Sequence, residues 1–288
     1  MATRPIRRNQ RKPKRPSTER QEPEDEAPVT PEIEEEAPLA PASLTALLST
    51  APIYTHFDIW LVGDTPLICH AWSLKARLEM LATQTKAVRD SKAARDPQAD
   101  FVSSLYEMSE GSGEYGFPLT GIKNCILSMA HKDRGVPRTT VRASLQLRAN
   151  IVRVRPALAG AICDMPLCRI YGGKPEMRED MVRVGAGLRK KATLAYRAQF
   201  WPWAIRIVGR VNTRMLPSEA LVFLAKEGGS ATGIGEWRNE RDGIFGSFHP
   251  ARVNEADAWG KFASGKGPLP HVDPWVGMDF DDNESEAA

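Results

Sequence analysis

Four cysteines in 288 residues are too few to staple a fold of this length with disulfides. Apolar residues never form a run close to the roughly 20 that a membrane helix needs. The basic N-terminus is not followed by an apolar segment, so a secretory signal peptide is not expected. These absences predict a soluble, cytoplasmic protein with reduced thiols and no membrane partner.

The motifs of the common enzyme classes are also missing. No Gly-Lys-Ser/Thr, Gly-x-Ser-x-Gly or His-Glu-x-x-His segment occurs. Cys163 and Cys168 are separated by four residues and Cys69 precedes His70, but no second close pair completes a zinc pattern. Three acids within residues 176–180 are more typical of a surface loop than of a metal site. We therefore expect no metal and no cofactor, and we favour a binding protein over an enzyme.

Charge is strongly segregated along the chain. Residues 1–20 hold eight Lys and Arg against one acid, and residues 21–37 hold eight acids and no base. Residues 134–214 hold 17 basic residues against four acidic ones, a local net charge of +13 compared with +3 for the whole chain. Such a local excess is typical of proteins that bind a polyanion. It favours nucleic acid as the partner, with an acidic protein partner as the alternative.

Composition divides the chain into three parts. Residues 1–50 are rich in Pro, Arg and Glu, which predicts a disordered charged tail, either simply solvated or acting as a basic arm for nucleic acid. Residues 51–250 form the predicted core, with an insertion at 73–110 and a basic hairpin region at 140–200. Residues 251–288 are expected to be peripheral, with an acidic, disordered end.

Apolar periodicity predicts the elements of an α+β core. The expected helices cover residues 73–94, 99–108, 119–132 and 217–227. The expected strands cover residues 53–62, 141–154, 166–171, 181–184, 193–196, 203–211 and 244–249. The pair Gly228-Gly229 is expected to end the last helix. This order favours an elaborated ferredoxin-like (βαββαβ) sheet with helical and hairpin insertions.

A polar segment punctuated by glycines spans residues 233–248. Glycines let a backbone approach a ligand closely, and free backbone N–H groups can hold phosphate. In one interpretation Gly233 and Gly235 serve this purpose, while Trp237 stacks on a base and Arg238 and Arg241 contact phosphates. In the other, the glycines form a tight turn and Trp237 packs against the edge of the sheet.

Basic side chains elsewhere complete the predicted interface. Residues 176–191 combine glycines with cations, which predicts a basic hairpin for a phosphate backbone, with a solvated hairpin tip as the alternative. The candidate nucleic-acid-binding residues outside the glycine-punctuated segment are Lys123, Arg142, Arg153, Arg178, Arg183, Arg189, Lys190 and Lys191.

The pattern G-x-G-x-x-x-x-x-x-x-G-x-F-G-x-F, which follows the predicted helix within residues 217–249, resembles the glycine-rich loop of the RAMP superfamily. These proteins are ferredoxin-like RNA-binding subunits of CRISPR effector complexes, and some are nucleases. The resemblance implies sequence-tolerant binding of single-stranded RNA or DNA and assembly as a homo-oligomer or ribonucleoprotein complex. A nuclease on the same scaffold and a structural or assembly protein are the alternatives. The chain as a whole also resembles phage and prophage proteins.

Overall fold

The computed structural model describes residues 52–85, 96–130, 135–184 and 191–272. It contains helices and antiparallel sheets, which confirms the predicted α+β class. The predicted tail over residues 1–50 and the hairpin residues Arg189 and Lys190 lie outside the described residues. None of the helices in the described ranges combines the length and apolar character needed to cross a membrane.

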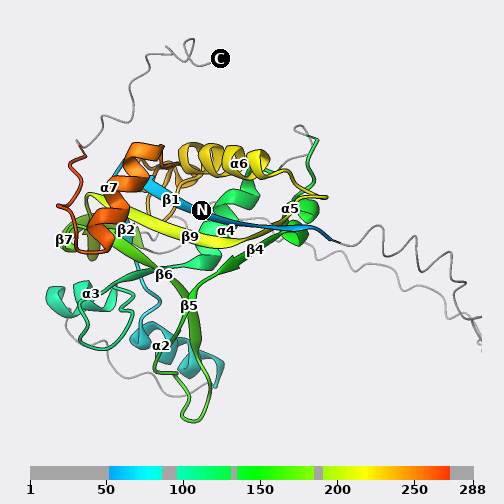
Figure 1. Ribbon diagram of the computed structural model, residues 1–288. Coiled ribbons are helices and arrows are strands. Elements are labelled where there is room, and N and C mark those ends of the chain that lie inside the picture. The colour runs from blue at the N-terminus through cyan, green and yellow to red at the C-terminus, as the bar shows by residue number, and fades with distance from the viewer. Residues whose placement is uncertain (1–51, 86–95, 131–134, 185–190, 273–288) are drawn as a thin grey trace, which may run out of the picture. The chain divides into compact units, whose positions relative to one another are not determined.

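The central sheet has the strand order β10-β1-β9, and β4 and β6 share the other edge of β9 (Figure 1). Its strands are β1 (Tyr54–Gly63), β4 (Leu145–Arg148), β6 (Asp164–Gly172), β9 (Trp203–Asn212) and β10 (Phe248–Pro250). β1 and β9 pair antiparallel along most of their length, from Tyr54↔Asn212 to Val62↔Ala204. Two short strands, β3 (Gly116–Pro118) and β5 (Asn150–Arg153), pair with β6.

Three strands form a second, smaller antiparallel sheet in the order β2-β8-β7. They are β2 (Leu67–Cys69), β7 (Glu176–Val184) and β8 (Lys191–Phe200). The insertion contributes α2 (Leu74–Gln84) and α3 (Pro97–Ser103). The Ser104 hydroxyl after α3 accepts a hydrogen bond of 2.9 Å from the backbone N–H of Ala198 on β8. The predicted basic hairpin is therefore the β7–β8 pair, anchored at its base by α3.

Two helices cover one face of the central sheet, α4 (Leu119–Ser128) and α6 (Ser218–Ala231) (Figure 1). Their apolar sides share one core cluster with the strand residues that point the same way, including Leu61, Ile205 and Ile207. A short helix, α5 (Arg138–Ser144), leads into β4. Because side chains alternate along a strand, the intervening residues of β1 and β9 must face away from these helices.

A further helix, α7 (Val253–Ala263), covers one end of the opposite face (Figure 1). Its Trp259 is buried in a second cluster with Trp60, Val62 and Ala204. The segment after residue 250, expected to be peripheral, therefore contributes to the core. The sequence signal for this packing is Trp259 alone, because the residues around it do not form an extended apolar pattern.

His249 ties α7 to the sheet. Its Nδ1 lies 2.5 Å from Asp64 Oδ1, and its Nε2 lies 3.2 Å from Glu255 Oε2 on α7. Burial lowers the pKa of His249, but the hydrogen bonds and negative charges of Asp64 and Glu255 more than offset this and raise it above its ordinary value. His249 thus bridges two carboxylates where α7 begins, and both favour its protonated form.

Several expected boundaries are wrong. The strand expected at 141–154 begins as helix α5. The strand expected at 244–249 shrinks to β10, because Gly246 turns the backbone at a φ of +67°. α6 does not end at Gly228 and Gly229 but runs on to Ala231. A Cβ at Gly229 would lie 1.9 Å from the Phe248 carbonyl oxygen, so this glycine permits close helix–strand packing rather than ending the helix.

Candidate nucleic-acid interface

The segment from Gly233 to Phe248, called here the glycine loop, folds back onto β2. Gly233, Gly235 and Gly246 all have positive φ, at +68°, +83° and +67°. The backbone N–H of Glu236 donates to the Ile68 carbonyl at 3.0 Å, and that of Gly246 donates to the Pro66 carbonyl at 2.9 Å. These donors are used within the protein, so they do not form a ready phosphate cradle.

Trp237 lies half-buried against the β7–β8 hairpin. Its ring centroid is 6.0 Å from the guanidinium carbon of Arg178 and 5.8 Å from that of Arg197. Phe245 packs beside it at 6.4 Å. The loop thereby brings the predicted site residues Trp237 and Arg178 together. The contacts themselves are those of the packing interpretation, in which Trp237 seats the loop on the sheet.

A network of charges holds this contact. Asp180, which is buried, lies 2.9 Å from Arg178 and 3.7 Å from Arg197. Arg197 in turn lies 2.6 Å from Glu236 of the glycine loop, and Glu236 lies 2.6 Å from His70 Nδ1. Burial of Glu236 raises its pKa, but the hydrogen bond and charge of His70 and the charge of Arg197 lower it below its ordinary value. These two arginines are therefore neutralised within the protein.

The other predicted residues lie on separate elements. Lys123 of α4 donates from Nζ to the Leu145 carbonyl at 3.0 Å, so it connects a helix to the sheet. Arg153 of β5 is ion-paired with Asp164 across the β5–β6 pair. Three further predicted cations have exposed side chains, namely Arg142, Arg183 and Arg241. The Lys191 side chain lies outside the described part of the hairpin.

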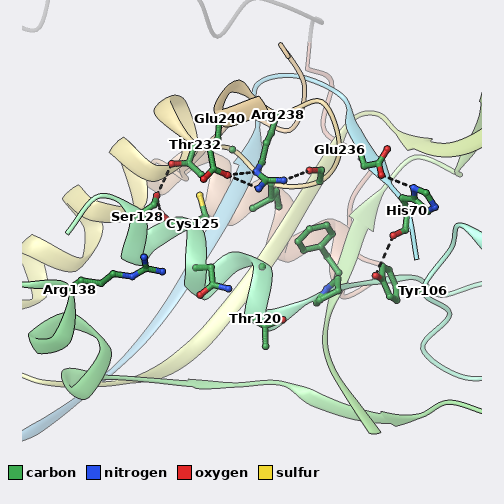
Figure 2. A pocket seen from close by; sticks show the side chains of 17 residues that line it. His70, Tyr106, Thr120, Cys125, Ser128, Arg138, Thr232, Glu236, Arg238 and Glu240 are labelled. Carbon is green, nitrogen blue, oxygen red and sulfur yellow. Dashed lines mark hydrogen bonds and ion pairs between the residues drawn. The ribbon is translucent and has the colours of Figure 1, made fainter. Parts of the chain in front are cut away.

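A hollow of about 500 Å³ lies between α4 and the glycine loop (Figure 2). Ser128 and Thr232 share a hydrogen bond of 2.7 Å on its walls. Arg238, predicted to contact phosphate, lies 2.6 Å from Glu240 instead. Glu236 lies at the other end of the hollow, paired as described above. Because acids and bases balance here, the hollow does not favour an anion.

The exposed part of the opposite sheet face has a different character. We call it the open face. It is formed by the residues of β1, β4 and β9 whose side chains point away from α4 and α6 and that lie outside the part of the sheet covered by α7. These residues are Tyr54, His56, Asp58, Gln146, Arg148, Arg206, Val208 and Arg210. None of them is among the binding residues predicted from the sequence.

The open face places arginines beside an aromatic ring. The guanidinium carbon of Arg210 lies 4.5 Å from the Tyr54 ring centroid, and Arg210 Nε donates to Gln146 at 2.7 Å. Arg206 is ion-paired with Asp58, and both side chains are about half exposed, at 49% and 44%. With Arg148, the face carries three arginines against one carboxylate. This combination of stacking surface and excess positive charge suits a single nucleic-acid strand.

Two residues of β6 extend the open face towards α7. Tyr171 is paired with Ala204, so it lies on the same side of the sheet as Arg206. Arg169, two residues earlier, points the same way, and its guanidinium carbon lies 4.9 Å from the Tyr171 ring centroid. The aromatic and basic pattern therefore continues along the sheet.

Three of the four cysteines do not offer a nucleophile. Cys69, Cys125 and Cys168 are buried, and burial raises the pKa of Cys125 to about 12 and that of Cys168 to about 11. These thiols stay protonated at neutral pH. Within the described ranges, no group of three or more His, Cys, Asp or Glu side chains is arranged to hold a metal ion.

Comparison with models of known protein families gives no match, and a search of the curated proteins gives none either.

Proposed function

We propose that this protein binds single-stranded nucleic acid, RNA or DNA, with little dependence on sequence, and that the strand lies across the open face. The observation that carries this proposal is the combination of Arg206, Arg210 and Arg148 with the Tyr54 ring on a sheet surface that no helix of the described residues covers. Phosphates contact the arginines, which supplies affinity that falls as salt rises. Bases stack on the half-buried Tyr54 and Tyr171 rings, which every base can do.

The sheet order supports a ferredoxin-like scaffold as part of the same proposal. The order β10-β1-β9-β4, with all neighbours antiparallel and with α4 and α6 as the two crossover helices, is the arrangement expected of a βαββαβ unit. β6, the β7–β8 hairpin and the helices α2 and α3 are then additions to this unit. Membership of the RAMP superfamily, and with it assembly along a strand, stays part of the proposal.

The glycine loop and the β7–β8 hairpin take a secondary part in the proposal. Exposed cations near them, Arg183 and Arg241, offer electrostatic contacts to a backbone that leaves the open face. Arg178 and Arg197 contribute less, because their side chains are only 30% and 10% exposed where they pair with Asp180 and Glu236, whereas the paired Arg206 is 49% exposed. Trp237 acts mainly to fix the loop.

A binding panel tests the proposal. Fluorescence anisotropy of the full chain with labelled single-stranded RNA, single-stranded DNA and duplexes of equal length should give tighter binding to single strands, weakening steadily with salt. Binding to an acidic protein or heparin that matches binding to the strands, with no preference for nucleic acid, would contradict it. Cleavage of the labelled strand would indicate the nuclease alternative.

A further inference from the structure

A second hollow, of about 440 Å³, opens where β6 meets α7, and we call it the aromatic cleft. Its walls are formed by α3, the loop before β3, the end of β6 with the turn after it, and α7. Four half-buried rings and one buried ring line it, those of Phe101, Tyr115, Tyr171, Phe262 and Phe200. The volume lies within the roughly 300–1,000 Å³ of small-molecule sites.

The rings of the aromatic cleft are held by neighbouring rings. Tyr115 packs against Phe200 with centroids 5.8 Å apart, and Tyr171 meets Trp60 edge-on at 5.0 Å. Phe262 meets the buried Trp259 edge-on at 5.9 Å. Because these contacts fix the rings before any ligand arrives, little side-chain entropy is lost on binding.

The rim of the aromatic cleft is basic. Arg169 lies over the Tyr171 ring and 2.9 Å from Glu114, the acid that lines the cleft. Lys174, on the turn after β6, is exposed, and among the described residues it has neither a hydrogen-bond nor an ion-pair partner. Lys174 can therefore contact an anionic group of a ligand that packs against the aromatic side chains.

We propose that the aromatic cleft holds one nucleotide of the bound strand, with its base against the rings and its phosphate at Lys174. A planar aromatic group joined to an anion fits both features, whereas an apolar ligand would leave the rim unused. Tyr171 connects the cleft to the open face, because its pairing with Ala204 places it on the same side of the sheet as Arg206. This inference rests on the proposed function, since the strand reaches the cleft by crossing the open face.

Mononucleotide binding tests the cleft separately from the open face. Titrations of the full chain, followed by NMR or calorimetry, would compare adenosine 5′-monophosphate with adenosine and with ribose 5-phosphate. We expect the nucleotide to bind about tenfold more tightly than the nucleoside, because the nucleoside lacks the charge-assisted contact to Lys174. Ribose 5-phosphate, which lacks the aromatic base that stacks on the rings, should bind more weakly than either.

The variants decide between outcomes. Lys174→Gln should reduce nucleotide affinity to that of the nucleoside, whereas Lys226→Gln, which removes an exposed charge on α6, should leave it unchanged. In addition, a strand carrying 5-iodouracil should photo-crosslink to Tyr171, Tyr115 or Phe262, and excess nucleotide should suppress this.

Oligonucleotide binding that depends on Arg206 and Arg210, without nucleotide binding or cleft crosslinks, would overturn the inference alone. Nucleotide binding without any oligonucleotide binding would overturn the proposed function together with the strand-based form of the inference.

Discussion

Replacing Trp237 with alanine should lower stability far more than nucleic-acid affinity. Trp237 is half-buried between Phe245 and the guanidinium groups of Arg178 and Arg197, and it seats the glycine loop on the β7–β8 hairpin. If its main role were to stack on a base, the substitution would instead cost about 1–3 kcal/mol of single-strand affinity.

The size of the stability loss follows from these contacts. Truncating a fully buried Trp costs about 3–5 kcal/mol, so a half-buried one should cost about 2 kcal/mol. Two cation–π contacts near the 6 Å limit add about 0.5 kcal/mol each. The sum is about 3 kcal/mol of unfolding free energy, which corresponds to a fall in Tm of roughly 6–12 °C for a domain of this size.

Denaturant unfolding and anisotropy binding on the same preparations supply the test. Trp72→Ala is the matched control, because Trp72 is 54% exposed and its removal should change stability by less than about 0.5 kcal/mol. A Trp237→Ala protein of unchanged stability that has lost single-strand affinity would refute the packing role and restore base stacking in the glycine loop.

Three further predictions concern stability. Gly246→Ala should cost more than about 3 kcal/mol of unfolding free energy, since Gly246 combines a positive φ with a Cβ position 1.8 Å from the Ile234 carbonyl oxygen. Gly111→Ala, at a similar φ but in open space, should cost about 1 kcal/mol, and equal losses in chemical denaturation would contradict the packing argument. Asp180→Asn should cost about 3 kcal/mol because it leaves buried Arg197 short of a partner, and a loss below 1 kcal/mol would show that Glu236 suffices. The pKa of His249 is higher in the folded state than in the unfolded state, so its contribution to folding stability is complete below about pH 6.5 and disappears as pH rises through the pKa of the folded state. His249→Gln should abolish that part of the pH dependence of the unfolding free energy, and an unaltered profile would exclude His249 as its source.

The fold class and most elements followed from local patterns. β1 is predictable because β-branched and aromatic residues gather in it, and β9 because Ile205 and Ile207 flank Arg206, the period that a half-covered strand requires. Short strands such as β2 and β3 were missed, because three residues carry no period. Gly228-Gly229 was misread as a helix end, since only the tertiary packing against Phe248 reveals why Cβ atoms are excluded there.

The candidate site was harder to predict than the fold. Charge density directs attention to residues 134–214, but it does not distinguish a cation that faces solvent from one paired with a carboxylate of the same chain. Arg178 and Arg238 each pair with an acid two residues further along the chain, whereas Arg206 pairs with the distant Asp58 at a half-exposed position. Arg206 and Arg210 are not among the binding residues predicted from the sequence. The open face depends on how β1 and β9 are paired. The residues that point away from the core on each strand form one surface only in the observed register, which the sequence of either strand alone does not reveal.

The most direct test of the open face is the salt dependence of single-strand binding by the double variant Arg206→Gln/Arg210→Gln. Losing two phosphate contacts should lower the affinity and reduce the slope of log affinity against log salt by about 1.4, since each contact to a single strand contributes about 0.7. The charge-matched control, Lys75→Gln/Lys226→Gln on helices α2 and α6, should keep the wild-type slope. If the open-face variant binds with wild-type affinity and slope while the control loses both, the strand does not lie on the open face.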